Sequence, residues 1–245
     1  LQLYTIRDHM EKDIPGSLKR VKEIGYDHVE LAGLGPYTAE EYSYFLADAG
    51  LTAISAHIGF KELTQDTTKA AEIAESLGLS FVIVPWLGGD LCPDAEAWKA
   101  NIAAMNDAGS KLREVGISLC YHNHAHEFER IDDTYIFDLI FELTDPENLA
   151  AEIDSYWVKF GGVDPVATIK KYAGRCPLLH VKDMEPEEPH SFTEMGRGMM
   201  DWKSIFAAAR QADVRWYIVE QDICKRDSFE SARISAEFMR GIANG

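Results

Sequence analysis

Long hydrophobic runs are absent from this sequence. No stretch of its 245 residues reaches the roughly 18 consecutive apolar residues that a membrane-spanning helix needs. We therefore expect no membrane partner. The hydrophobic content of 46% is nevertheless ordinary for a globular protein and sufficient to build a sizeable core.

Cysteine is also scarce, with 4 residues that lie far apart and form no C-x-x-C pair. Such isolated residues form neither the disulfide framework of a small secreted domain nor a thiolate zinc site. Reduced thiols in a cytosolic protein are the simplest interpretation, and we predict a cytoplasmic location.

Positive charge is limited, because 24 lysine and arginine residues face 41 aspartate and glutamate residues, for a formal net charge of −17. Binding of nucleic acid depends on basic patches that contact phosphates. The acidic balance therefore argues against a nucleic-acid partner. It is compatible with a small anionic substrate, since a metal ion or a local basic side chain dominates the field inside a cleft.

Strand-like and helix-like segments alternate along the whole chain, and no linker or low-complexity segment divides it. This alternation predicts one domain over residues 1–245, a single (β/α)8 TIM barrel of the α/β class. A doubly wound open sheet is the alternative, but no glycine-rich phosphate fingerprint follows the first predicted strand. The predicted strands are Leu1–Ile6, His28–Leu31, Thr52–His57, Phe81–Pro85, Ile117–His122, Ala150–Asp154, Leu178–Lys182 and Trp216–Glu220.

Capping residues mark the predicted helices. Pro15 begins one helix and Gly25 ends it. Thr38 and Glu41 form a capping box at the start of a second helix, which Gly50 ends. The other predicted helices are Thr67–Leu77, Ala95–Val115, Tyr135–Leu143, Val166–Tyr172, Trp202–Ala212 and Phe229–Ile242.

Four consecutive predicted strands end on side chains of the kinds that bind metals: His122, Asp154, His180 and Glu220. Because the carboxyl ends of parallel strands meet on the catalytic face of a TIM barrel, we expect these side chains to form one site. Two imidazoles and two carboxylates suit Mn²⁺, Zn²⁺, Co²⁺ or Fe²⁺. We predict a divalent metal cofactor, manganese in the first place, with zinc, cobalt, iron or magnesium as alternatives.

Neighbouring acidic residues leave part of this ligand set open. Glu127 and Glu129 lie in the loop after the fifth predicted strand, where we expect them to be solvated, yet either is an alternative ligand to His122. Asp183 and Asp222 are interpreted as helix caps or ion-pair partners and not as ligands.

Proton abstraction beside a carbonyl needs a base and an electrophile that stabilises the enediolate. We predict that the metal is the electrophile and that Glu220 serves both as ligand and as base. His57, His122 or His124 then moves the second proton, because imidazole titrates near neutral pH.

Lys182 is the one basic residue placed among these strand ends. It lies two residues after His180 and therefore on the same face of the strand. A lysine in that layer is costly unless it is paired or faces the substrate. We predict that it contacts a substrate or enolate oxygen; an ion pair with Glu152 or Glu220 is the structural alternative.

Further residues at strand ends are candidates for substrate binding. Arg7 and Glu30 end the first and second predicted strands and suit hydroxyl or carboxylate groups. Trp157, together with Trp86 and Tyr4, offers an apolar face on which a sugar ring stacks, although core packing is an equal alternative for each.

The succession of Asp154, His180 and Glu220 at strand ends resembles the xylose-isomerase-like TIM barrel superfamily, in particular its sugar phosphate isomerases/epimerases. The resemblance covers essentially the whole chain. It implies a TIM barrel with one divalent metal, often manganese, that acts on a sugar or a sugar-derived ketone. Its other matching segments are Leu1–Asp8, Gly25–Leu31, Tyr121–His124, His180–Asp183, Gly196–Gly198 and Asp201–Trp202.

Two positions depart from the ketose 3-epimerases of this superfamily. Those enzymes end strand 5 on a glutamate, which works with the strand-8 glutamate on opposite faces of the substrate, whereas this chain has His122. They also tend to carry a histidine shortly after the strand-6 aspartate, where this chain reads Ser155, Tyr156 and Trp157.

The resemblance predicts a metal-dependent isomerase or epimerase that acts on a ketose or keto-sugar through an enediolate. The missing strand-5 glutamate keeps a second reaction open, in which a lyase or hydratase cleaves a 3-keto-glycoside by elimination from the same enolate. We expect a small-molecule carbohydrate as the substrate. Assembly into a homo-oligomer agrees with the superfamily, which often forms dimers or tetramers.

Two other functions fit the sequence less well. An apurinic endonuclease of the same fold needs three zinc ions and a basic face for DNA, which the acidic composition does not offer. A non-catalytic sugar-binding barrel would hold no transition metal, so a bound metal would distinguish it from an enzyme.

Overall fold

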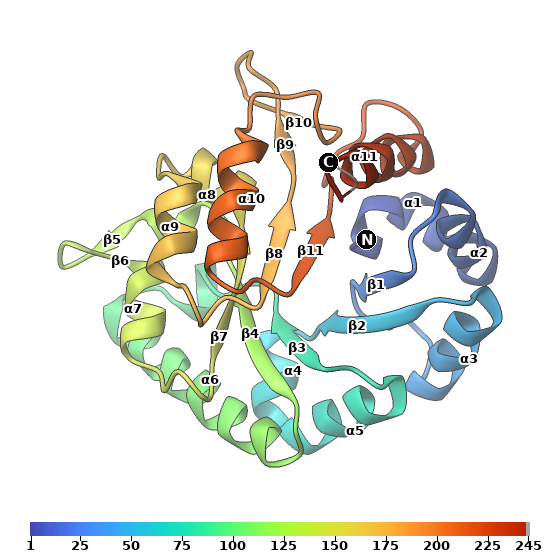
Figure 1. The fold of residues 1–245 in the computed structure, drawn as a ribbon. Helices are drawn as coiled ribbons and strands as arrows, with labels where there is room; N and C mark the ends of the chain where they lie inside the picture. The colour runs from blue at the N-terminus through green and yellow to red at the C-terminus, as the bar shows by residue number, and fades with distance from the viewer. Residues whose placement is uncertain (244–245) are drawn as a thin grey trace.

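The strands of this protein form one parallel sheet that curves into a barrel, as the computed structural model of residues 1–243 shows (Figure 1). Hydrogen-bonded neighbours follow the order β1-β2-β3-β4-β7-β8-β11. This arrangement confirms the predicted TIM barrel. The barrel strands are β1 (His28–Leu31), β2 (Thr52–His57), β3 (Phe81–Val84), β4 (Ser118–His122), β7 (Ala150–Asp154), β8 (Leu178–Val181) and β11 (Trp216–Val219).

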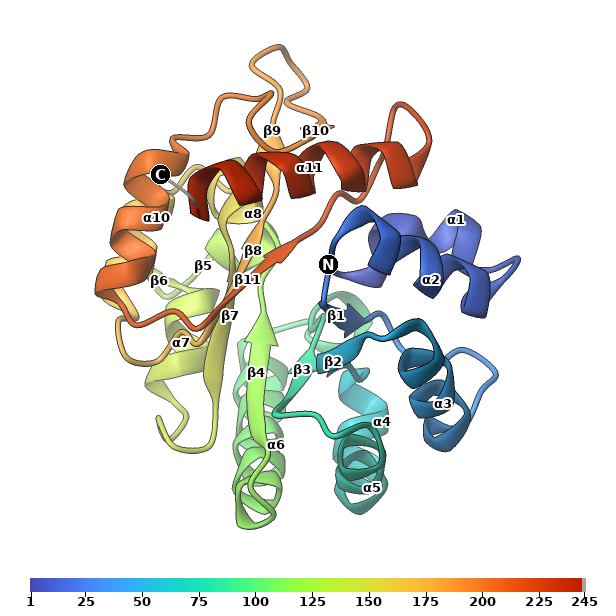
Figure 2. The same cartoon turned by 45° about the vertical axis from the view of Figure 1, so that its right-hand side comes forward.

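The prediction of a first strand over Leu1–Ile6 is wrong. Only Gln2 forms a parallel bridge, with Glu30 of β1, while its backbone N–H donates to Val219 O of β11 at 2.9 Å. The chain then turns into a short 3-10 helix, η1 (Leu3–Ile6), because the Gln2 side chain accepts a hydrogen bond from Tyr4 N. The first residues therefore lie between β11 and β1, where Figures 1 and 2 show the chain start.

Helices surround the sheet on its outer side (Figures 1 and 2). The predicted helices are confirmed to within a residue or two at each end, and the capping box of Thr38 with Glu41 is present. Gly25 ends its helix at a positive φ of 106°, which glycine adopts without strain. The helices are α1 (Arg7–Met10), α2 (Ile14–Ile24), α3 (Ala39–Ala49), α4 (Phe60–Gln65), α5 (Thr67–Leu77), α6 (Ala95–Glu114), α7 (Ile136–Glu142), α8 (Ser155–Phe160), α9 (Pro165–Lys171), α10 (Trp202–Gln211) and α11 (Ser228–Ala243).

Short elements that the sequence pattern did not predict occupy the connecting loops. They include α4, α8 and two antiparallel strand pairs, which are too short to show a period of their own. The pairs join β5 (Arg130–Ile131) to β6 (Thr134–Tyr135) and β9 (Asp183–Met184) to β10 (Phe192–Thr193); the remaining 3-10 turns are η2 (Gly89–Leu91) and η3 (His126–Phe128).

The barrel interior has an apolar lower layer and a polar upper layer. A separate cluster of buried apolar side chains fills the lower part and packs apart from the main core between sheet and helices. Side chains alternate along a strand, so residues two positions further on share the same inward face nearer the carboxyl ends. The members of the lower cluster are Ile54, Phe81, Ile83, Cys120, Leu178 and Ile218.

An irregularity between β1 and β2 adjusts the register of the polar layer. Val29 pairs with Ala53 but Glu30 pairs with Ser55, so Ile54 is an extra residue in β2. Such a bulge re-aims the side chains that follow it. Here it leaves Ile54 in the apolar layer and directs Ser55 towards the Glu30 carboxylate, with its Oγ 2.5 Å from Glu30 Oε2.

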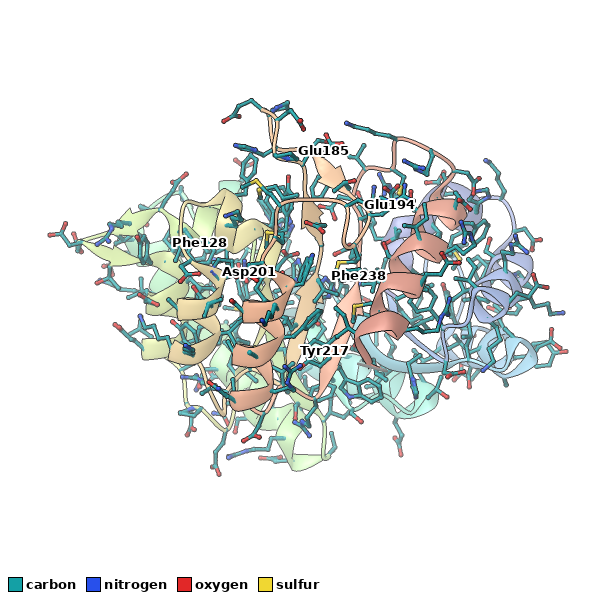
Figure 3. All side chains as sticks on the ribbon, turned by 45° about the horizontal axis from the view of Figure 1, so that its top comes forward. Phe128, Glu185, Glu194, Asp201, Tyr217 and Phe238 are labelled. Carbon is teal, nitrogen blue, oxygen red and sulfur yellow. The ribbon has the colours of Figure 1, made fainter. Side chains whose placement is uncertain are left out.

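Asp183 organises the loop between β10 and α10. Its buried carboxylate accepts hydrogen bonds from Gly196 N, Met200 N and Trp202 Nε1 at 2.8 to 3.2 Å. The segment Gly196–Gly198 wraps around this carboxylate, so its resemblance to an anion-binding loop has a structural explanation. Figure 3 shows Phe238 of α11 near this loop, and its ring would lie 2.2 Å from a Cβ at Gly196.

None of the helices within residues 1–243 is long and apolar enough to cross a membrane.

Gly109 is a position at which the packing of α6 tolerates no side chain. A Cβ there would lie 1.9 Å from the Asn148 carbonyl oxygen, next to the start of β7. We predict that Gly109→Ala lowers the free energy of unfolding by about 1–3 kcal/mol, because backbone must move to admit the methyl group. Urea denaturation measures the difference.

The matched control is Gly241→Ala in the exposed part of α11, where a Cβ meets nothing within 4 Å. Alanine stabilises an open helical position by up to about 1 kcal/mol over glycine. Equal effects of the two substitutions on the urea midpoint would contradict the close approach at Gly109.

Candidate metal centre at the mouth of the barrel

A cavity of about 630 Å³ opens at the carboxyl ends of the barrel strands. TIM-barrel enzymes place their active sites at this end. Most residues predicted to act in the site line this cavity, although they come from all parts of the chain. The lining comprises Tyr4, Arg7, His57, Pro85, Trp86, His122, His124, Trp157, Lys182, Phe192, Glu220, Asp222 and Ile223.

The four predicted ligands lie together. His122, Asp154, His180 and Glu220 each offer one ligand atom, and these atoms all lie within 4.8 Å of one another. All four side chains are buried, at the ends of β4, β7 and β8 and directly after β11. Parallel pairing of the strands brings them together, since Asp154 is in register with His180.

Asp154 is held by hydrogen bonds that turn its second carboxylate oxygen towards the cluster. Its backbone N–H donates to Asn123 Oδ1 at 2.9 Å, and its Oδ1 caps helix α8 by accepting from Trp157 N. Its Oδ2 is buried and lies 2.9 Å from the Lys182 ammonium nitrogen and 3.8 Å from His122 Nε2. This oxygen therefore faces a cationic group and is placed to serve as a ligand for a metal cation as well. Asn123 therefore helps to position Asp154. Nothing in the sequence pattern indicated this role, because it depends on a contact between β7 and the loop after β4.

His122 presents one nitrogen to the cluster and the other to a deeper carboxylate. Its Nδ1 lies 3.1 Å from Glu152 Oε2, and its Nε2 lies 3.8 Å from Asp154 Oδ2. Burial, helped by the charge of His180, holds the pKa of His122 well below its usual range. The neutral imidazole thus donates through Nδ1 and keeps a lone pair on Nε2 for a metal.

His180 has carboxylates at both ring nitrogens. Its Nδ1 lies 2.8 Å from Glu220 Oε2, and its Nε2 lies 2.8 Å from Glu30 Oε1 and 3.2 Å from Glu152 Oε2. Burial lowers the pKa of His180, but the charges of Glu152 and Glu30 outweigh burial and hold it well above its usual range. A cation on the Nδ1 side would take the place of the proton that faces Glu220.

Glu30 was predicted to bind substrate, but the structure does not bring it to the cavity. It is fully buried below the ligand cluster, where Ser55 Oγ and Gln2 Nε2 donate to it. It also lies 3.0 Å from His57 Nε2. Burial lowers the pKa of His57, yet the charge of Glu30 reverses this and raises it to about 9. Glu30 and Glu152 thus form a deeper layer that orients the imidazoles.

Lys182 forms the ion pairs that were the structural alternative for it, though not with Glu152. Its Nζ lies 2.6 Å from Glu220 Oε2, 2.8 Å from Asp222 Oδ1 and 2.9 Å from Asp154 Oδ2. Burial lowers the pKa of Lys182, but these carboxylates hold it well above its usual range. The ammonium group therefore shares two carboxylates with the candidate metal and still lines the cavity.

His124 faces the cavity between two tryptophans, with ring centroids 5.0 Å from Trp86 and 5.4 Å from Trp157. Burial lowers the pKa of His124 to about 3, so its imidazole is neutral at pH 7. The loop that carries it is fixed by Glu127, which accepts hydrogen bonds from Tyr121 Oη and His124 N.

The expectation that Glu127 is solvated is wrong, because its side chain is fully buried; Glu129 is exposed. Neither belongs to the groups of side chains that can hold a metal within residues 1–243. The burial of Glu127 follows from the buried Tyr121 hydroxyl, which needs an acceptor.

The donor set fits a divalent cation. Four buried carboxylates surround three imidazoles, and the ammonium group of Lys182 lies beside them. The carboxylates are those of Glu30, Glu152, Asp154 and Glu220, and the imidazoles are those of His57, His122 and His180. Buried charge of one sign is costly unless it is compensated. The second carboxylate oxygen of Asp154 and the nitrogen donors of two histidines match the ligands of manganese, zinc, cobalt or iron sites.

A parallel barrel with a cluster of titratable side chains at the carboxyl ends of its strands has the architecture of a TIM-barrel enzyme. The family match is specific: residues 18–242 match the xylose isomerase-like TIM barrel family. The chain belongs to this family.

Two inosose dehydratases are similar in sequence. The protein from Geobacillus kaustophilus is 24% identical, over 95% of this chain and 87% of its own length. The protein from Lacticaseibacillus casei is 27% identical, over 61% of this chain and 56% of its own length. The chain thus matches little more than half of the second relative.

Solved structures are similar over nearly the whole chain. A sugar phosphate isomerase/epimerase from Parabacteroides distasonis superposes with a TM-score of 0.87 at 28% identity, covering 98% of this chain and 92% of the other. A probable 3-DHS dehydratase from Bacillus anthracis, at 13% identity and a TM-score of 0.75, shares the fold. The proteins similar to this chain thus include a sugar phosphate isomerase/epimerase and dehydratases.

We predict that the protein binds one divalent ion per chain and that His180→Ala and Glu220→Ala each abolish this binding, because each removes a ligand from a closely spaced set. Elemental analysis after loading with Mn²⁺ and desalting measures the occupancy. The controls are His28→Ala and Glu129→Ala, which remove exposed side chains of the same types. Full occupancy in both ligand variants would refute the assignment.

We further predict that Glu152→Gln lowers the affinity for Mn²⁺ by roughly 10–100-fold, the usual effect of removing a partner that orients a metal-binding histidine. The carboxylate at this position faces both His122 and His180 through one oxygen, Oε2, so an amide keeps the shape of the side chain but removes the negative charge that favours the two imidazole N–H groups. Titration calorimetry measures the affinity, and an unchanged value would show that the deeper layer does not orient the ligands.

Proposed function

We propose that this protein is a metal-dependent lyase that eliminates a β-substituent from a keto-sugar or keto-cyclitol through an enolate. Dehydratases remove water by elimination, and the similar curated proteins are inosose dehydratases. The isomerase or epimerase reaction is the second candidate, because a sugar phosphate isomerase/epimerase is similar at 28% identity. Both reactions begin with removal of a proton beside a carbonyl.

The observation that carries the proposal is the one-sided distribution of carboxylates around the cavity. Glu220 and Asp222 are the carboxylates that line it within residues 1–243, and both follow β11. The positions across the cavity carry the imidazoles of His57, His122 and His124. An epimerase with a carboxylate on each face of the substrate would need one at the end of β4, where His122 stands.

His122, Asp154, His180 and Glu220 would hold the metal. When bound, a divalent ion there supplies a Lewis acid beside a carbonyl or hydroxyl oxygen of the substrate. The deeper layer of Glu30 and Glu152 keeps the imidazoles in the tautomers that this binding requires.

Glu220 and His124 both line the cavity and are the candidate bases for the proton beside the carbonyl. The imidazole of His124 lies beside Trp86 and Trp157, and its lowered pKa leaves it uncharged but only weakly basic. The C–H electron pair then forms the enolate, and Lys182 donates a hydrogen bond to its oxygen once one of its three N–H groups turns away from the three carboxylates that pair with it. The enolate expels the β-substituent together with its bonding pair, and the substituent takes up the proton that the base removed.

We predict that a keto-sugar with a β-leaving group, incubated with the Mn²⁺-loaded enzyme in D₂O, releases that group and yields an α,β-unsaturated ketone. His124→Ala and Lys182→Met lower kcat by about 10²–10⁴-fold, the usual contribution of acid–base catalysis. His28→Ala serves as the control far from the cavity. Deuterium exchange with an intact skeleton would refute the lyase and support the isomerase.

A further inference from the structure

A second cavity, of about 520 Å³, lies beside the reaction cavity. The two share Tyr4 and Arg7 as lining residues. The second cavity is bounded by the short helices η1 and α1, the start of α2 and the loop after β1. Nothing in the proposed elimination uses this space, although the two residues that it shares with the reaction cavity place the two cavities next to each other.

The shared wall presents a flat, fixed surface. The Tyr4 ring is 43% exposed, and the Arg7 guanidinium lies 4.1 Å from its centroid. Arg7 also donates to the Tyr4 carbonyl oxygen at 3.0 Å, which holds the pair together. An exposed aromatic ring in such a setting is suited to stacking against a ring of the ligand.

The far wall of the second cavity also presents an exposed tyrosine ring. Tyr37 is 36% exposed and is braced edge-on by Phe45 at a centroid distance of 5.3 Å. Gly33 and Gly35 adopt positive φ angles, and the space where their Cβ atoms would be is empty to 4 Å within residues 1–243. The loop therefore leaves room for a ligand beside Tyr37.

The charges in the second cavity balance one another. Arg7 and Lys12 face Glu11 and Asp13 among the lining residues. A cavity with no excess positive charge does not select a phosphate or a carboxylate. A neutral ring that stacks on tyrosine and accepts or donates hydrogen bonds fits it better.

The combined size of the two cavities exceeds what a single sugar ring needs. Each volume lies in the range of roughly 300–1,000 Å³ that suits a whole drug-sized ligand. We infer that the substrate is a keto-glycoside whose leaving group is a neutral ring bound in the second cavity between Tyr4 and Tyr37. This inference rests on the proposed lyase function, and it names an aglycone in place of water as the group expelled.

Elimination of such a group balances without an additional reactant. The base takes the proton beside the ketone, the enolate forms, and the glycosidic C–O bond breaks with its electron pair going to the aglycone oxygen. That oxygen receives the proton that the base took, and the aglycone leaves as an alcohol or phenol. The sugar ring remains as the unsaturated ketone.

The test separates binding in the second cavity from turnover. Phenyl β-glucoside has no ketone and cannot be eliminated, so calorimetry with the Mn²⁺-loaded enzyme reports binding alone. Three compounds then report turnover: 3-keto-glucose, its phenyl glycoside and its glucosyl glycoside. The last two distinguish an aryl aglycone from a second sugar.

Two substitutions alter the second cavity without touching the metal cluster. Tyr37→Ala removes the far stacking surface, and Ala32→Trp fills the cavity from an exposed position in its lining. We expect each to weaken binding of phenyl β-glucoside and to raise KM for the glycosides by roughly 3- to 10-fold, which is the change in affinity expected from the loss of one aromatic contact. The kinetics with 3-keto-glucose stay unchanged. Tyr44→Ala is the matched control, since Tyr44 also touches Phe45 but lies outside both cavities.

The outcomes distinguish the two hypotheses. Unchanged glycoside binding and KM in both variants would overturn the second cavity as the aglycone site, even when the wild-type enzyme releases phenol. Weakened binding combined with no release of phenol or glucose by the wild-type enzyme would overturn the lyase and retain the cavity as a ring-binding site.

Discussion

The need to compensate buried negative charge governs the centre of this protein. Four carboxylates, those of Glu30, Glu152, Asp154 and Glu220, are buried at the top of the barrel. Their charge is met by imidazoles and by the Lys182 ammonium group, which lies within 2.9 Å of both Asp154 and Glu220. Burial of such groups is unfavourable unless each is paired and hydrogen-bonded. The arrangement of neighbouring residues follows from this requirement.

The barrel satisfies the requirement in two layers. Parallel pairing sets His122 beside Glu152 and Asp154 beside His180. The extra residue Ile54 in β2 adjusts the register of Ser55 to Glu30. The deeper carboxylates accept from the imidazoles, so the outer nitrogens and the second Asp154 oxygen face one another at the mouth of the barrel. The layer that compensates the buried charge thereby also arranges side chains that could hold a divalent metal.

Family membership and the side chains of the candidate site together restrict the possible reactions more than either does alone. The xylose isomerase-like barrel hosts isomerases, epimerases and dehydratases, so the fold does not choose among them. The choice depends on which acids and bases face the substrate. The replacement of a carboxylate by His122 at the end of β4 and the adjoining cavity at Tyr4 are features of this chain that favour elimination from an extended substrate.

Much of the fold was predictable from the sequence. The alternating pattern predicted the barrel and its helices, because strand and helix periods and capping residues are local properties. The first strand was mispredicted, since Leu1–Ile6 has a strand-like composition and only the Gln2 contacts with Tyr4 and Val219 turn it into a 3-10 helix. That outcome depends on a local side-chain contact, from Gln2 to Tyr4, and on the distant strand end at Val219, and neither is visible in the periodic pattern.

The sequence by itself determined the candidate ligands His122, Asp154, His180 and Glu220, because each one directly ends a recognisable strand. Tertiary structure alone decided what surrounds them. It buried Glu30 and Glu127, paired Lys182 with three carboxylates and opened the second cavity beside Tyr4. These features arise where separate strands and loops meet, and a periodic pattern carries no information on distances between segments that are far apart in the chain.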